Sequence, residues 1–164
     1  MTLTNRIKLL LLALLLTVGV VLADQVSKAM VRDFFSGRDP VLEYGSYFML
    51  VSAWNTGVSF SLFAESGRAG AIFFTVLALV VSIGLLVWLF LQPLLSRSIA
   101  VGLVAGGAIG NGLDRLRFGA VYDFLYFHIG SWGWPAFNLA DSTIVIGVGI
   151  IILFDLFKGS NKSI

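Results

Sequence analysis

The chain has 164 residues, of which 58% are apolar and only 12% are charged, whereas a soluble domain has about 25% charged residues. So few charges cannot cover the surface of a soluble domain, and so many apolar residues exclude a disordered chain. Eleven basic and nine acidic residues form no basic cluster, which excludes a nucleic-acid-binding protein. With no cysteine and one histidine, the chain has no disulfide, no cysteine nucleophile and no histidine-cluster metal site. We therefore expect a membrane protein whose few charged residues carry its function.

Four apolar segments reach, or nearly reach, the roughly 20 residues that a membrane span requires. The predicted spans are 7–23, 69–91, 98–118 and 137–157, within a single domain 1–164. The first segment also resembles a cleaved secretory signal, because it starts with basic residues and ends in Val21-Leu22-Ala23. We favour an uncleaved span, because Asp24 and Lys28 follow it directly. Four spans place both termini on one side, and the basic residues at both termini predict that this side is cytoplasmic.

Two connections then lie on the outer side. Segment 40–64 is rich in aromatic and β-branched residues with turn formers between them, and residues 59–63 alternate polar and apolar. We expect a small β-sheet there, lying on the membrane surface between the first and second helices. Residues 118–135 are predicted to form a loop, in which Trp132 and Trp134 lie at the membrane interface.

Polar side chains recur at helical spacing near the outer ends of three spans. Asp24 and Lys28 are spaced i,i+4, which fits either an ion pair that ends the helix or a contact to substrate. Asn111, Asp114 and Arg115 share one face of the third span, where the guanidinium could bind a carboxylate or a peptide carbonyl.

The fourth span begins with another such pair, Asn138 and Asp141. Asn138 could cap this helix, and Asp141 would be stabilised by the positive helix N-terminus. Asp123 lies among large apolar residues in the predicted loop, where burying a lone carboxylate is costly.

Two carboxylates are the best-equipped catalytic groups in this sequence. No serine lies in a nucleophile-elbow context, and no spacing supports a serine paired with Lys28. Two neighbouring aspartates share one proton, so that the charged one can activate a water while the protonated one polarises a scissile carbonyl. Spacing makes Asp141 one member of such a pair and leaves both Asp114 and Asp123 as candidates for the other.

Five blocks of the sequence resemble those of the lipoprotein signal peptidase, or signal peptidase II, family. They are Asp24-Gln25-Val26-Ser27-Lys28, Asn55-Thr56-Gly57-Val58-Ser59-Phe60, Gly110-Asn111-Gly112-Leu113-Asp114-Arg115, Val121-Tyr122-Asp123-Phe124 and Phe137-Asn138-Leu139-Ala140-Asp141-Ser142. They occur in the family's order across nearly the whole chain, and this combination with four spans is highly specific.

The resemblance implies an aspartyl endopeptidase of the bacterial inner membrane, with several spans and its active site at the periplasmic face. Such an enzyme removes the signal peptide from diacylglyceryl-modified prolipoproteins, on the amino side of the lipidated cysteine. The resemblance assigns Asp123 and Asp141 as the catalytic pair. It implies substrate-binding or supporting roles for Asp24, Lys28, Asn55, Gly57, Asn111, Asp114, Arg115, Asn138 and Ala140.

The resemblance also implies the partners of the chain. We expect no metal and no cofactor, and the partners are the lipidated precursor and membrane lipid. We expect a monomer, and the glycine row Gly102, Gly106 and Gly110 would allow close helix packing either within one chain or between chains.

Two other functions fit the sequence less well. A presenilin-like intramembrane protease would share the dipeptide Tyr122-Asp123, but the Gly-x-Gly-Asp half of that signature is missing, because Leu139-Ala140 precede Asp141. A small proton-coupled transporter would need internal repeats and acids near the bilayer midplane, whereas these acids gather at one membrane face.

Overall fold

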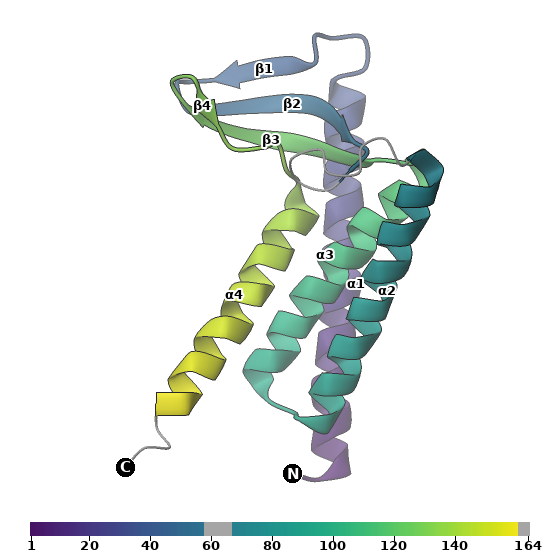
Figure 1. Ribbon diagram of the computed structural model, residues 1–164, viewed down its shortest axis with the longest axis vertical. Helices are drawn as coiled ribbons and strands as arrows, with labels where there is room; N and C mark the ends of the chain where they lie inside the picture. Colours follow the sequence, from purple (N-terminus) through teal and green to yellow (C-terminus); the bar gives the residue numbers. More distant parts are fainter. Residues whose placement is uncertain (58–66, 161–164) are drawn as a thin grey trace.

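Four helices and a small sheet make up the described part of the chain. The computed structural model describes residues 1–57 and 67–160, and the side chains of the last helix as far as Phe154. The helices are α1 (Leu3–Phe34), α2 (Gly67–Leu91), α3 (Leu95–Phe118) and α4 (Leu139–Ser160). The strands are β1 (Val41–Tyr44), β2 (Phe48–Asn55), β3 (Val121–Ile129) and β4 (Trp132–Gly133). The sheet lies across one end of the helical bundle, and α1 begins and α4 ends at the other (Figure 1).

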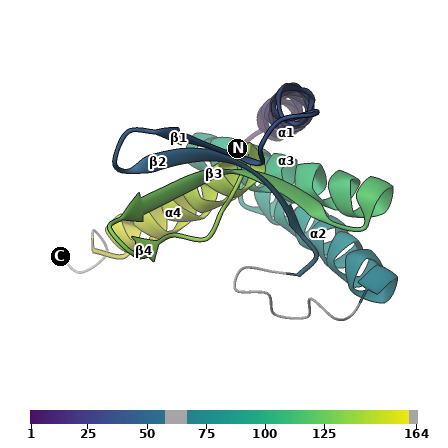
Figure 2. The same cartoon turned by 90° about the horizontal axis from the view of Figure 1, so that it is seen from above.

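Helix α3 is the central helix, since α1, α2 and α4 all pack against it (Figure 2). Its small residues allow this close packing. A Cβ atom added at Gly102 or Gly106 would lie 2.6 Å from the Cβ of Leu16 or Val20 on α1. The predicted glycine row therefore packs against α1 within the chain.

Apolar side chains on the outside of the bundle fit a membrane environment. Helices α1 and α2 are long and apolar enough to cross a bilayer. Their outward residues are widely exposed, as are apolar residues of α4 such as Leu153, which is 54% exposed. Helix α1 is longer than the predicted span, because it continues through Asp24 and Lys28 to Phe34.

The sheet is antiparallel, with strand order β1-β2-β3-β4, and is formed by the connection between α1 and α2 together with that between α3 and α4. The prediction of a loop at 118–135 is wrong, because Val121–Ile129 form a strand that pairs with β2. Gly119 ends α3 in the left-handed conformation (φ 74°), which turns the chain into β3. The sheet is thus not confined to the segment between α1 and α2, and the alternation predicted at 59–63 lies outside the described residues.

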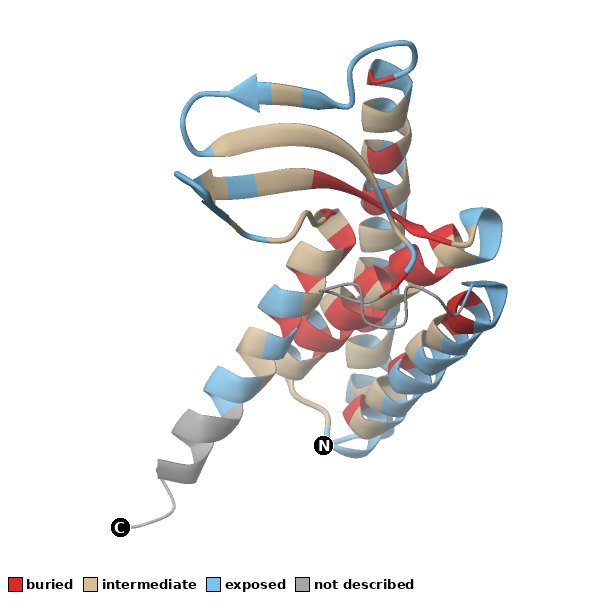
Figure 3. Ribbon diagram, turned by 45° about the horizontal axis from the view of Figure 1, so that its top comes forward, coloured by how far each residue is buried: buried red, intermediate tan, exposed pale blue. Residues whose placement is uncertain are grey.

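Buried residues concentrate along α3 and where it meets β3 and the first turn of α4 (Figure 3). Many of them are polar or charged, which is unusual for a protein interior. They include Asp24, Lys28, Asn111, Asp114, Asp123 and Asn138. This junction is where the predicted site residues converge.

Candidate active site

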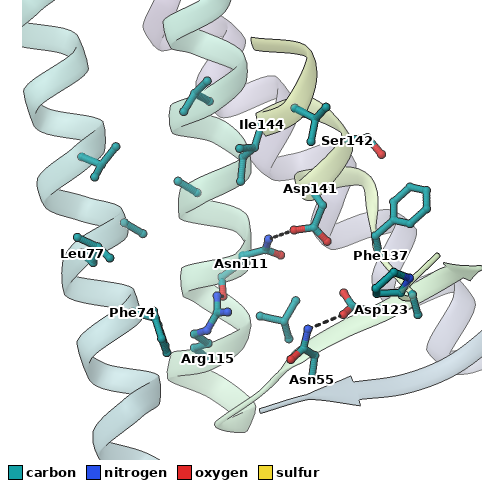
Figure 4. A pocket seen from close by; sticks show the side chains of 18 of the residues that line it. Asn55, Phe74, Leu77, Asn111, Arg115, Asp123, Phe137, Asp141, Ser142 and Ile144 are labelled. Atoms are coloured by element: carbon teal, nitrogen blue, oxygen red, sulfur yellow. Dashed lines mark hydrogen bonds between the residues drawn. The ribbon is translucent and has the colours of Figure 1, made fainter. Parts of the chain in front are cut away.

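A cavity of about 830 Å³ opens between α2, α3 and α4, next to the sheet (Figure 4). Polar side chains line the end near the sheet, and apolar side chains line the rest. The polar group consists of Asn55, Asn111, Arg115, Asp123, Asp141 and Ser142, and the apolar group includes Phe74, Leu77, Val81, Val104, Ile144 and Val145.

Asp123 on β3 and Asp141 in the first turn of α4 approach this polar end from different elements (Figure 4). Each of their four carboxylate oxygens accepts a hydrogen bond from an amide. Asn55 Nδ2 and Asn138 Nδ2 donate to Asp123 at 3.1 and 2.7 Å. Asn111 Nδ2 and the Asn138 backbone N–H donate to Asp141 at 2.8 and 3.1 Å. The two carboxylates are thus held by donors that leave little freedom to rotate.

Asp123 is 2% exposed, and this burial changes its acidity. Burial raises the pKa of the Asp123 carboxyl to about 7, and the neighbouring Asp141 carboxylate adds to the rise. Hydrogen bonds from Asn55 and Asn138 and the charge of Lys28 oppose this rise in part. Asp123 therefore holds a proton under mildly acidic conditions, in which an exposed aspartate is ionised.

Asn138 both caps α4 and binds Asp123. Its Oδ1 accepts from the Asp141 backbone N–H at 3.0 Å, while the Asp141 carboxylate accepts from the Asn138 N–H. This reciprocal pair is a capping box, and it places Asp141 at the positive end of the helix. Capping uses the oxygen of the Asn138 amide and leaves its Nδ2 free to bind Asp123. The capping role and the site role are therefore compatible.

A β-bulge brings Asn55 to the face of the sheet that carries Asp123. Leu50 pairs with Leu125 and Ala53 pairs with Asp123, so three positions on β2 match two on β3. Strict alternation from Leu50 would turn position 55 to the opposite face. The extra residue shifts the alternation, so that Ala53 and Asn55 share the face of Asp123.

A buried ion cluster lies behind the cavity. The Lys28 ammonium bonds the carboxylates of Asp24 and Asp114 at 2.9 and 2.8 Å, and all three side chains are at most 3% exposed. Because α1 continues past this point, Asp24 and Lys28 do not form an ion pair that ends the helix. Asp114 does not line the cavity, whereas Asp123 does.

The remaining predicted residues hold the surrounding backbone. Arg115 lines the cavity and donates from Nη2 to the Gly57 carbonyl at 3.1 Å, which ties the end of β2 to α3. The Ala140 N–H donates to Asp24 Oδ1 at 3.0 Å, and Ala140 is fully buried. Every predicted site residue thus lines the cavity, belongs to the ion cluster, or is hydrogen-bonded to a residue that does.

Two residues of this region are missing from the sequence prediction. Gln25 Nε2 donates to Asp24 at 3.2 Å and to Asp114 at 2.9 Å, so it bridges the two carboxylates as Lys28 does. Its i,i+3 spacing from Lys28 is a signal that could have identified it. The Tyr122 backbone N–H donates to Asp114 at 3.2 Å, a contact that has no sequence signal.

The described residues contain no group of three or more His, Cys, Asp or Glu side chains that could hold a metal ion. Neighbouring carboxylates such as those of Asp123 and Asp141 are groups that can act as a general acid and a general base.

Comparisons with known proteins converge on one family. A family model described as signal peptidase (SPase) II matches residues 16–157. The lipoprotein signal peptidase of Anaplasma phagocytophilum is 40% identical over 147 residues, which cover 89% of this chain and 93% of that protein. That of an Azoarcus species is 44% identical over 151 residues, covering 91% and 85%. A solved structure described as a bacterial membrane enzyme superposes with a TM-score of 0.78 at 30% identity, covering 92% of this chain and 91% of its own.

Proposed function

The chain belongs to the signal peptidase II family, and we propose that it is an aspartyl endopeptidase acting on diacylglyceryl-modified prolipoproteins. It removes the signal peptide by hydrolysing the peptide bond on the amino side of the lipidated cysteine. The observation that carries the catalytic assignment is the pair Asp123 and Asp141, which approach one polar cavity end with all four oxygens hydrogen-bonded to amides. Asp114 is not a catalytic candidate, because it does not line the cavity and its carboxylate is ion-paired with Lys28.

The two aspartates divide acid and base roles through one shared proton. Asp123 carries this proton, in keeping with its pKa of about 7, and donates a hydrogen bond to the scissile carbonyl. Asp141 takes a proton from a water, whose oxygen attacks the carbonyl carbon and forms a tetrahedral intermediate. Asp141 then gives this proton to the cysteine nitrogen as the C–N bond breaks, which regenerates its carboxylate. The products are a carboxylic acid on the signal peptide, which ionises on release, and a free amine on the lipoprotein.

The shape of the cavity suits an amphiphilic substrate. On α3 its lining runs from Arg115 through Asn111 and Ala108 to Val104, about 16 Å along the helix at 1.5 Å per residue. Only the end near the sheet is polar. An apolar signal segment or acyl chain can lie along the apolar part of the cavity, away from the sheet, while the scissile bond reaches the carboxylates.

We place the chain in the bacterial inner membrane, with both termini cytoplasmic and the aspartates at the periplasmic face. Arg6 and Arg97 lie at the end of the bundle away from the sheet, where Arg6 donates to the last carbonyls of α2. Basic residues are enriched at cytoplasmic ends of spans, which supports this orientation. The glycine row is covered by α1, which supports a monomer whose partners are the lipidated precursor and membrane lipid.

The test is cleavage of a lipidated precursor by purified variants in detergent or lipid. Asp123→Asn and Asp141→Asn should each lower the cleavage rate by at least about 10²–10⁴-fold, the contribution of a general acid or base. Asp33→Asn, an exposed aspartate on α1, is the matched control and should cleave normally. Mass analysis of a lipidated precursor beside an unmodified one tests the lipid requirement. Full activity of either catalytic variant would refute the aspartyl mechanism, and equal cleavage of both precursors would refute the substrate class.

A further inference from the structure

The Lys28 ammonium occupies the centre of the buried polar groups behind the cavity. It donates to Asp24 Oδ2 at 2.9 Å, Asp114 Oδ2 at 2.8 Å and Asn111 Oδ1 at 2.9 Å. These contacts use all three of its N–H donors, and Lys28 is 2% exposed and does not line the cavity. Resting on the proposed function, we propose that Lys28 is a positioning residue that sets the spacing of the two catalytic aspartates without touching the substrate.

Two of the three contacts act on the backbone next to the aspartates. Asp114 accepts from the Tyr122 N–H at 3.2 Å, and Tyr122 directly precedes Asp123. Asp24 accepts from the Ala140 N–H at 3.0 Å, and Ala140 directly precedes Asp141. The residue before each catalytic aspartate is therefore held by one carboxylate of the cluster.

Lys28 joins these two carboxylates into one unit. Its ammonium is bonded to both, and opposite charges at this distance attract strongly in a buried site. Gln25 also bridges them, but it is neutral and cannot balance their charge. Without Lys28, two buried carboxylates would repel each other, and the strand and the helix that they hold would separate.

The third contact determines the orientation of the Asn111 amide. Asn111 Oδ1 accepts from both Lys28 Nζ and Asn138 Nδ2, at 2.9 and 3.1 Å. Because both partners are donors, the amide cannot turn over without facing its own NH₂ toward one of them. Asn111 Nδ2 is consequently directed at Asp141 Oδ1, at 2.8 Å. Lys28 thus acts on Asp141 through a side chain as well as through the backbone.

At Tyr122, the edge of β3 that does not pair with β2 is bound by side chains instead of by another strand. The Tyr122 N–H is bound by Asp114 and its carbonyl accepts from Asn138 Nδ2 at 3.3 Å, while β2 pairs with the other edge. A side chain of α3 and the residue that caps α4 therefore fix the strand that carries Asp123 at the point where it approaches the helices.

The experiment compares Lys28→Met with Lys8→Met, the same substitution at an exposed position of the same helix. For Lys28→Met, kcat per folded molecule on a lipidated precursor should fall about 10²-fold, the loss that about 1 Å of misplacement can cause. The KM should stay within about threefold, since the cavity lining is intact. Lys8→Met should match the unmodified enzyme in both constants.

The pH profile provides a readout that a purely structural role would not move. Burial raises the pKa of Asp123, and the charge of Lys28 opposes that rise, as do the hydrogen bonds from Asn55 and Asn138. Removing the ammonium should therefore move the alkaline limb of kcat to higher pH. The other charged groups around Asp123, on α1, α3 and α4, are Asp24, Asp114, Arg115 and Asp141.

Lys28→Met with Asp24→Asn is the second variant, because it removes one of the two carboxylates that Lys28→Met leaves uncompensated. It should fold and show the same low kcat. The proposal fails if kcat per folded molecule of either variant stays within threefold of the unmodified enzyme and the alkaline limb does not move. It also fails if neither variant folds, because Lys28 would then serve folding alone. Asp123→Asn in the same assay separates the hypotheses: activity there would refute the catalytic dyad itself, whatever the Lys28 variants do.

Discussion

Replacing Asp123 by asparagine should make the folded protein more stable at pH 8, even though it removes activity. Burial and the Asp141 carboxylate raise the pKa of Asp123 from 3.8 to about 7. At about 1.4 kcal/mol for each pH unit, holding this group ionised in the fold costs about 4 kcal/mol. Asparagine carries no charge and avoids that cost.

The gain is reduced by one hydrogen bond. Both oxygens of Asp123 accept from amides, of Asn55 and Asn138, but an asparagine has only one oxygen. Its NH₂ group would face a donor, which costs about 1–3 kcal/mol. We therefore expect Asp123→Asn to unfold with a free energy about 1–3 kcal/mol higher than the unmodified protein at pH 8.

The pH dependence of this difference is the sharper quantity, because the hydrogen-bond cost is the same at every pH. A raised pKa in the folded state stabilises the fold fully below the unfolded value of 3.8, and this stabilisation is lost as pH rises through about 7. From pH 5 to pH 8 the unmodified protein should lose about 3 kcal/mol relative to Asp123→Asn.

The measurement is equilibrium unfolding of the purified protein in detergent at pH 5 and pH 8, followed by tryptophan fluorescence. Asp33→Asn removes an exposed carboxylate and is the control, so its difference from the unmodified protein should not change with pH. A difference between Asp123→Asn and the unmodified protein that is equal at both pH values would show that Asp123 is not perturbed, and the acid role given to it would fall.

Three further outcomes follow from the structure. Cleavage of a lipidated precursor should decline as pH rises through about 7, where Asp123 loses its proton. Asn55→Leu should move this decline to higher pH, because it removes a hydrogen bond to the Asp123 carboxylate. A cleavage rate that is independent of pH from 5 to 9 would contradict this. Gly106→Val should lower the free energy of unfolding by about 1–3 kcal/mol, because its Cβ would lie 2.6 Å from the Cβ of Val20 on α1. Gly84→Val is the control: the space around Gly84 is open, so the free energy of unfolding should change little in the same denaturation assay. Arg6→Met should cost about 1 kcal/mol in that assay by uncapping the last carbonyls of α2, and an unchanged midpoint would show that this contact adds nothing.

Much of the site could be predicted from local spacing. Asp24 and Lys28 are four residues apart on one helix, and they form an ion pair in the structure. Asn138 and Asp141 have the spacing of a cap, and they form one. These contacts depend only on helical periodicity, which a sequence displays directly.

The strand β3 could not be predicted in the same way. Its residues were predicted to form a loop because they lie between two helices. Their partner is β2, about 70 residues earlier in the chain, and no local pattern reveals a pairing across that distance. The sequence spacing also could not decide whether Asp114 or Asp123 is the second catalytic aspartate. That decision depends on which carboxylate forms the ion pair with Lys28, a contact between two different helices.

The sequence by itself determined that this chain resides in a membrane and that its scarce charges gather near one end of its helices. It determined this because hydropathy and helical spacing are properties of neighbouring residues. Only the tertiary structure decided that Asn55 faces Asp123, through one extra residue in β2, and that Lys28 lies between two carboxylates from different helices. Such arrangements arise from strand register and helix packing, which depend on contacts between distant parts of the chain.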